Sequence, residues 1–225
     1  MIKATLLGYT QVAPDLDLNI ESVQDLIAYC AKVSNPQGQT NLEESTRLLN
    51  YLIKHKHWSP FEMASAVIEV ETTRDIARQF LRHRSFSFQE FSQRYANPED
   101  METAFVTREA RLQDHKNRQN SVALEDTDTS GVADWWETNQ LHHIEQSKML
   151  YRAALERGIA KEQARAVLPE GNTVSRVTAN GTIRSWIHYV ELRAGNGTQK
   201  EHMDLAVAIG KAIASIFPMM ESMYV

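Results

Sequence analysis

The chain has 225 residues, of which 42% are hydrophobic and 24% are charged, so it can bury one sizeable core as an ordinary globular protein. Its formal net charge of −5 excludes a generic attraction to nucleic acid, so any anion site must be a local concentration of positive charge. A single cysteine excludes an internal disulfide, and no apolar run suits a signal peptide or a membrane span, so we expect a reducing cytoplasm and no membrane partner.

The N-terminal half of the chain alternates strand and helix patterns. Strands are predicted over residues 2–9 and 64–73, and amphipathic helices over 22–34, 41–56 and 74–84. We expect Ser22 to cap the first helix, and Pro60 to prevent the second helix from continuing.

The C-terminal half is mostly helical in pattern. A short strand is predicted over residues 101–112, a further strand over 173–180, and helices over 132–157, 161–168, 182–195 and 200–217. The polar residues 114–131 are expected to form a surface excursion that is mobile or poorly ordered, and Gly158 is expected to end the long helix. Because strands and helices follow no regular strand–helix–strand rhythm and no domain boundary is visible, we predict an α+β fold with a single domain over residues 1–225, in which helices flank a mixed sheet.

The segment "RHRSFSFQEFSQRY" (82–95) concentrates positive charge in an acidic protein. Arg74, Arg78 and Arg82 share one helical face, a pattern that most often marks a solvated surface stripe. No acidic residue lies four positions from Arg78 or Arg82, and the basic residues continue beyond the helix among serine hydroxyls. Guanidinium groups and hydroxyls bind phosphate oxygens, so these residues modestly favour an anion site over a surface stripe.

This segment resembles the signature of the flavin-dependent thymidylate synthases, which runs Arg-His-Arg, a spacer and Ser-x-Arg. Three further motifs resemble that family in the same order: "HWSPFEM" (57–63), "ARAVLP" (164–169) and "RSWIHYVELR" (184–193). The resemblance spans about residues 55–215, most of the chain, and four separated motifs must coincide for it to arise.

The resemblance implies an enzyme that converts dUMP to dTMP. Methylenetetrahydrofolate would supply the carbon, FAD would carry the hydride and NADPH would reduce the flavin, in a homotetramer whose active sites are shared between chains. The only cysteine, Cys30, lies in a predicted amphipathic helix and is expected to be a buried hydrophobe rather than a thiolate nucleophile. The uracil ring would then be activated by a guanidinium that stabilises the developing negative charge.

The resemblance also implies a role for individual residues, with Arg193 as the catalytic group at the ionised N3 edge of the pyrimidine. Contacts with dUMP are implied for Gln79, Arg82, Glu90, Phe91, Ser92, Gln93, Arg94, Arg165 and Arg193. Contacts with FAD are implied for Ser59, Arg82, His83, Arg84, Glu90, Thr182, Arg184 and His188. Arg165 is expected to reach the substrate phosphate from a neighbouring chain.

Two departures from the family pattern leave parts of the flavin site open. Either Asn180 or Thr182 could take the place of a family asparagine, and the histidine that often follows the last arginine has no counterpart before His202.

Other signals are weaker. His55 and His57 have a spacing that could hold a metal, but a third ligand is missing and no metal site is predicted. Trp135 and Trp136 are expected to anchor the long helix in the core or in an interface. One alternative to an enzyme is an arginine-rich module that grips nucleic acid, which the net charge opposes, so no nucleic-acid partner is expected. Another alternative keeps the family fold without turnover.

Overall fold

Four strands form one sheet at the centre of the molecule, which the computed structural model describes over residues 2–15, 18–125, 130–195 and 197–224. Their order across the sheet is β1 (Lys3–Tyr9), β2 (Ser65–Thr73), β6 (Val174–Thr182) and β3 (Ser87–Glu90). All three neighbouring pairs are antiparallel. The predicted α+β class is therefore confirmed, whereas the predicted mixed sheet is wrong.

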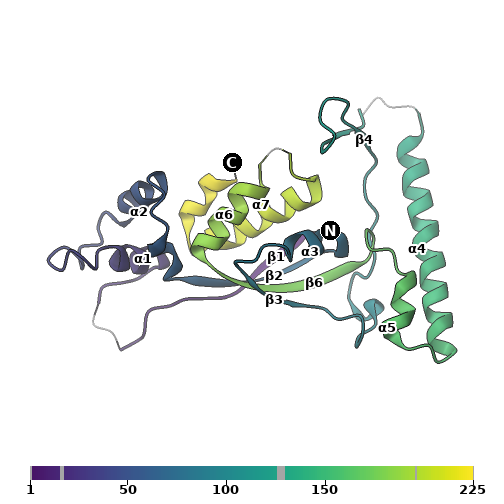
Figure 1. Ribbon diagram of the computed structural model, residues 1–225, viewed down its shortest axis with the longest axis horizontal. Coiled ribbons are helices and arrows are strands. Elements are labelled where there is room, and N and C mark those ends of the chain that lie inside the picture. The colour runs from purple at the N-terminus through teal and green to yellow at the C-terminus, as the bar shows by residue number, and fades with distance from the viewer. Residues whose placement is uncertain (1, 16–17, 126–129, 196, 225) are drawn as a thin grey trace.

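Helices cover one face of this sheet and extend the molecule at both ends (Figure 1). They are α1 (Val23–Ala31), α2 (Ser45–Lys54), α3 (Arg74–Phe80), α4 (Val132–Glu156), α5 (Lys161–Ala164), α6 (Ile183–Arg193) and α7 (Lys200–Ala214), with shorter 3-10 helices η1 (Ser59–Glu62), η2 (Pro98–Asp100), η3 (Arg165–Val167) and η4 (Pro218–Met223). Helices α6 and α7 lie over the sheet, α1 and α2 lie at one end, and α4 and α5 lie at the other.

The antiparallel pairing of β2 with β6 separates the starting points of the helices that follow them. Each strand passes directly into a helix, β2 into α3 and β6 into α6. The amide of Arg74 donates to the carbonyl of Thr173 beside the start of β6, and the amide of Ile183 donates to the carbonyl of Ala64 beside the start of β2. The two helices therefore begin at opposite ends of the sheet, whereas parallel pairing needs a crossover that carries the chain back to the same end.

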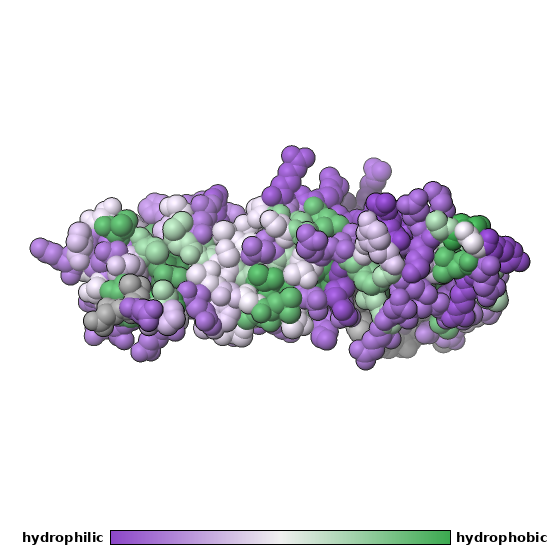
Figure 2. Space-filling model, turned by 90° about the horizontal axis from the view of Figure 1, so that it is seen from below, coloured by the Kyte–Doolittle hydropathy of each residue, from purple (hydrophilic) through white to green (hydrophobic). Residues whose placement is uncertain are grey.

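The main core lies between the sheet and the helices α3, α6 and α7. Its members include Ile68 and Val177 on the sheet, Phe80 on α3, Trp186 on α6 and Ile209 on α7, all with 0% of their surface exposed. Burial alternates along β2, so every second side chain faces away from the core, as the pleat requires. Figure 2 shows the molecule from the uncovered side of the sheet, where polar surface surrounds smaller apolar groups.

Two predicted helix boundaries, one at each end of the molecule, are confirmed. The Ser22 hydroxyl accepts a hydrogen bond from the amide of Asp25 at 3.1 Å, which confirms Ser22 as the cap of α1. At the other end, α4 is followed by Gly158 with a φ of +79°, so the glycine ends the helix in the left-handed conformation as predicted. A second small core, built around Tyr151, Ala164 and Leu168, joins α4 to α5.

Trp135 and Trp136 are not anchored in the core of the chain. Their side chains are 62% and 38% exposed, and the two rings stack on each other with centroids 6.2 Å apart. The part of the prediction that placed them in the core is wrong, because the buried residues of α4 begin one turn later, at Gln140, and include Ile144 and Tyr151.

Local structure differs from the predicted elements in three places. Most of residues 101–112 are irregular, but Arg111–Gln113 form β4, which pairs with β5 (Ser121–Ala123) in an antiparallel hairpin that was not predicted. The polar segment therefore contains ordered strand, and its residues 126–129 lie outside the described residues. Strand β3 was also not predicted, and α3 ends before Arg82 because the chain must turn there to enter β3.

No helix of the described residues is long and apolar enough to cross a membrane. His55 and His57 are exposed at the end of α2, and within the described ranges no three or more His, Cys, Asp or Glu side chains are grouped to hold a metal ion.

The loop that carries Arg82, His83 and Arg84 is held on the sheet by an aromatic ring. Phe86 lies directly over Gly181 of β6, where an added Cβ would come 2.3 Å from the ring. The ring also packs against Trp186, with centroids 4.3 Å apart. The absence of a side chain at Gly181 therefore allows the close approach that positions the basic loop.

Gly181→Ala should reduce the free energy of unfolding by about 1–3 kcal/mol, because the new methyl group displaces Phe86 from a packed site. Urea unfolding measures this change. Gly171→Ala is the matched control, since no atom lies within 4 Å of its added Cβ. Equal stability of the two variants would contradict the packing described here.

Candidate active site

One group of the predicted residues meets where α3, α6 and α7 converge. Arg193, at the end of α6, donates from Nε to Nε2 of His83 at 3.1 Å. Burial and the neighbouring Arg193 charge lower the pKa of His83 to about 4, so its imidazole is neutral at physiological pH. An arginine stays protonated in proteins, so this contact leaves one positive charge on Arg193 and none on its partner.

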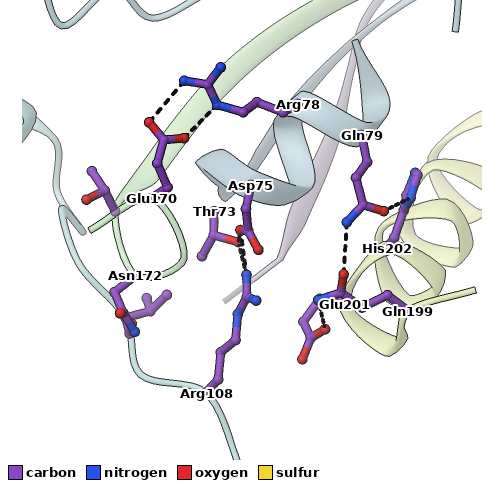
Figure 3. A network of polar contacts seen from close by, with 12 residues as sticks. Thr73, Asp75, Arg78, Gln79, Arg108, Glu170, Asn172, Gln199, Glu201 and His202 are labelled. Atoms are coloured by element: carbon purple, nitrogen blue, oxygen red, sulfur yellow. Dashed lines mark hydrogen bonds and ion pairs between the residues drawn. The ribbon is translucent and has the colours of Figure 1, made fainter. Parts of the chain in front are cut away.

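Gln79 lies beside this pair and is held at both ends of its amide (Figure 3). Its Nε2 donates to Oε1 of Gln199 at 2.8 Å, and its Oε1 lies 3.1 Å from Nδ1 of His202. The other ring nitrogen of His202 lies 3.1 Å from the Tyr189 hydroxyl. Burial, followed by the charge of Arg193, lowers the pKa of His202 to about 4, and its side chain is fully buried.

A second group gathers around α5, at the end of the molecule that carries α4. Nε of Arg94 lies 3.5 Å from a carboxylate oxygen of Glu162, and Nε of Arg165 donates to the backbone carbonyl of the same residue at 3.3 Å. The Ser92 hydroxyl accepts from the amide of Arg94 at 3.4 Å. A hydroxyl and two guanidinium groups thus face the same small region, a suitable set of donors for a phosphate.

Gln93 and Phe91, both predicted to contact dUMP, are constrained by burial and by backbone pairing. Gln93 is only 3% exposed, so its side chain is turned inward. The amide of Phe91 donates to the carbonyl of Arg176 and continues the pairing of β3 with β6.

Glu90 and the arginines of α3 form a network of ion pairs. Glu90 accepts from the buried Arg74 at 3.4 Å and from the Ser175 hydroxyl at 3.0 Å. Arg78 donates from Nε to Glu170 at 2.6 Å. No acidic residue lies four positions from Arg78, but the chain still supplies a partner for it: Glu170 is 92 residues away in sequence, and only the fold brings the two together.

Several residues predicted to contact the flavin lie around the start of α6, whereas Glu90 lies beside Arg74 at the start of α3 and His83 contacts Arg193 at the end of α6. Arg184 donates to Glu62 of η1, and the Thr182 hydroxyl accepts from the amide of Ser185 at 3.2 Å to cap the helix. Ser59 is exposed on η1. Asn180 is exposed on the sheet, so both residues that could take the place of the family asparagine remain candidates.

His188 lies on the second turn of α6. It packs edge-on against Trp58 with ring centroids 4.5 Å apart, and burial followed by the charge of Arg184 lowers its pKa.

Arg82 and Arg84 supply the free positive charge of this region. Both side chains are exposed, and neither has a hydrogen-bond or ion-pair partner within the residues that the structure describes. The Ser185 hydroxyl donates to the carbonyl of Ser85 at 3.3 Å, which ties their loop to α6 near Arg184. Unpaired guanidinium groups next to hydroxyl donors suit a diphosphate, so these residues fit FAD.

A cavity of about 540 Å³ opens beyond Gln199, between the β4–β5 hairpin and the first turns of α4 and α7. Trp135, Trp136 and Lys200 are among its lining residues. Most of the charged side chains that line this cavity are paired within the chain. Lys200, for example, forms an ion pair with Asp204 at 2.6 Å.

The fold and these clusters define an α+β protein with exposed arginines, Arg82 and Arg84, of the kind that bind anionic ligands, and comparison with known sequences is more specific. The family model described as "Thymidylate synthase complementing protein" matches residues 18–219. A probable flavin-dependent thymidylate synthase of Paramecium bursaria Chlorella virus 1 is 52% identical over 199 residues, which cover 88% of this chain and 89% of that protein. A flavin-dependent thymidylate synthase of Synechocystis sp. is 49% identical over 197 residues, covering 88% of this chain and 87% of that protein.

Solved structures agree with the sequence comparison. A crystal structure of the UMP/dUMP methylase PolB from Streptomyces cacaoi, bound with 5-Br dUMP, matches with a TM-score of 0.80 at 25% identity. The match covers 100% of this chain and 94% of that chain. The chain therefore belongs to the flavin-dependent thymidylate synthase family.

The hydrogen-bond partners of Gln79 were not found by sequence reasoning. His202 and Gln199 lie after the last family motif, and Tyr189 lies inside a motif without a role assigned to it. The sequence pattern could have indicated that His202 is buried, because His202 shares the apolar face of α7 with Leu205 and Ile209.

The two buried histidines should make the protein less stable in mild acid. The unfolded chain binds a proton at each histidine below about pH 6.5, whereas the folded chain keeps His83 and His202 neutral until a pKa of about 4. The free energy of unfolding is therefore unaffected by these histidines above about pH 6.5, and it falls as the pH is lowered from about 6.5 toward about 4.

Urea unfolding at about pH 7.5 and about pH 5.5, at one protein concentration, measures this loss. His83→Asn should flatten the pH dependence, and His143→Gln, on the exposed face of α4, should leave it unchanged. The same slope in all three proteins would show that His83 is not responsible.

Proposed function

We propose that the chain acts as a flavin-dependent thymidylate synthase whose active site is completed between copies of the chain in a homotetramer. The reaction is that of its family, the reductive methylation of dUMP to dTMP with methylenetetrahydrofolate as carbon donor and NADPH as reductant. The shared site is supported by one observation: within one chain, the predicted contacts with dUMP fall into separate groups.

The separation follows from the fold. Gln79 and Arg193 lie over the sheet, whereas Arg94 and Arg165 lie around Glu162 at the end of the molecule near α4. No hydrogen bond or ion pair joins the two groups anywhere in the described part of the chain. A second copy that places its α5 against the first copy's α6 brings base contacts and phosphate contacts to one nucleotide.

Arg193 is suited to activating the pyrimidine. Its Nε is engaged by the neutral His83, which fixes the plane of the guanidinium and leaves the terminal N–H groups for a ligand. Because no second cation shares the contact, the full positive charge of Arg193 is available to stabilise negative charge that develops on the uracil ring.

Ser92, Arg94 and Arg165 are suited to binding the phosphate. The acidic partner of Arg94 lies 3.5 Å away, and both side chains of that ion pair are about half exposed, at 53% and 50%. Exposed ion pairs of this kind contribute at most about 1 kcal/mol, so a phosphate dianion can displace the carboxylate.

Arg82, Arg84 and Arg184, with Ser59 and Thr182, would hold FAD at the start of α6. FAD, when bound, supplies the hydride that completes the methyl group. Glu90 has a positioning role, since its contacts with Arg74 and Ser175 tie the end of β3 to the start of β6 and of α3.

The thiol of Cys30 takes no part in this proposal. Cys30 lies in α1, at the end of the molecule opposite α4, and burial raises its pKa. A thiol with a raised pKa is mostly protonated at neutral pH and is a poor nucleophile. We further propose that residues 1–225 act as one domain and that the protein works in the reducing cytoplasm.

Mixing two inactive variants tests the shared site. Arg94→Ala and Arg193→Ala should each lower turnover at least about a hundredfold, because each removes a charged contact with the nucleotide. If the two arginines at one site come from different chains, co-expression of the variants should restore about a quarter of wild-type activity by random assembly.

In the control, Arg47→Ala replaces one of the two inactive variants in the co-expression. Arg47 lies on the exposed surface of α2, so this substitution leaves the site intact. A mixture of Arg94→Ala and Arg193→Ala that is as inactive as either variant alone would place both arginines in one chain and refute the shared site.

Cys30→Ser should retain turnover within about twofold and lose at most about 1 kcal/mol of stability, because the thiol serves packing rather than chemistry. Turnover with dUMP, methylenetetrahydrofolate, NADPH and FAD is measured beside urea unfolding. A folded Cys30→Ser protein without activity would overturn the proposed activation by Arg193.

A further inference from the structure

Five side chains form a continuous line of hydrogen bonds that joins α7, α3 and α6. The line runs through Glu201, Gln199, Gln79, His202 and Tyr189, and Figure 3 shows its first four members. Gln79, at the centre of the line, is proposed above to contact dUMP.

The carboxylate of Glu201 sets the direction of the first two bonds. An ionised carboxylate can only accept, so the group of Gln199 that faces it at 2.8 Å must be the NH2. The oxygen of Gln199 therefore faces Gln79, which must present its own NH2 at 2.8 Å. The oxygen of Gln79 is then turned toward His202.

The hydrogen bonds of the His202 imidazole continue the same donor-to-acceptor order. Because the oxygen of Gln79 accepts, Nδ1 of His202 carries the proton. A neutral imidazole has one proton, so Nε2 is bare and accepts from the Tyr189 hydroxyl at 3.1 Å. Tyr189 is 1% exposed and burial raises its pKa, so the phenol keeps the proton that it donates.

We infer that His202 is a positioning residue for Gln79, and that the line anchored at Glu201 turns the amide so that it offers a free N–H to the nucleotide. One N–H of Gln79 is held by Gln199 and its oxygen is held by the buried His202. The remaining N–H recognises a hydrogen-bond acceptor, such as a carbonyl oxygen of the pyrimidine. The inference rests on the proposed contact between Gln79 and dUMP.

The 15N spectrum of the histidine ring, recorded without substrate, tests the direction of the line. A protonated and a bare ring nitrogen resonate apart, so the spectrum identifies the tautomer of His202. We expect Nδ1–H in the wild type. Glu201→Gln should give a mixture of tautomers, because a glutamine can donate as well as accept. Glu43→Gln, on an exposed loop, is the matched control and should keep the wild-type tautomer.

Binding of dUMP by calorimetry tests the consequence for the site. His202→Leu should lose about tenfold in dUMP affinity, whereas His202→Asn, which keeps a donor for Gln79, should lose less, with FAD content unchanged in both. An Nε2–H tautomer in the wild type would overturn the inference, as would unchanged dUMP affinity in a folded His202→Leu protein.

These outcomes separate the inference from the proposed function. A wild-type protein that does not bind dUMP would refute the proposed function, while the substrate-free spectrum would still decide the direction of the line. Gln79→Ala with wild-type dUMP affinity would refute the contact on which the inference rests.

Discussion

The antiparallel pairing of β2 with β6 determines where the helices of the active site begin. The register runs without interruption from Ser65 opposite Thr182 to Thr73 opposite Val174, and each strand passes straight into a helix. Because the two strands run in opposite directions, α3 and α6 start at opposite ends of the sheet and approach each other over one face. Gln79 and His83 after one strand, and Arg193 after the other, meet for this reason.

The distribution of charge separates structural arginines from those that serve the site. Arg74, Arg78 and Arg108 are paired with carboxylates around the start of α3, where they stabilise the junction of strand and helix. Arg82 and Arg84 have no such partner in the described residues, and Arg193 is paired only with a neutral imidazole. Three cations without a carboxylate partner in the described residues therefore lie where an anionic nucleotide and an anionic cofactor are expected.

Several elements could be predicted because their information is local. The cap at Ser22, the end of α4 at Gly158 and the strand that becomes β2 depend on neighbours within a few residues. The strands of the β4–β5 hairpin are close in sequence, but they are short and lie in a polar segment, so they give little strand pattern. The antiparallel order of the sheet and the pairing of Arg78 with Glu170 depend on segments far apart in sequence. No local pattern indicates such partners, so the sequence reasoning missed them or judged them wrongly.

By itself, the sequence determined the family and predicted the residues of the proposed site, because four motifs carry side chains whose chemistry depends on residue type and order. The tertiary structure alone decided how those residues are grouped, which arginines are free, and that His202 holds Gln79. The physical reason is that hydrogen bonds and ion pairs act over a few ångströms in space, and only the folded chain brings residues 79 and 202 within that distance.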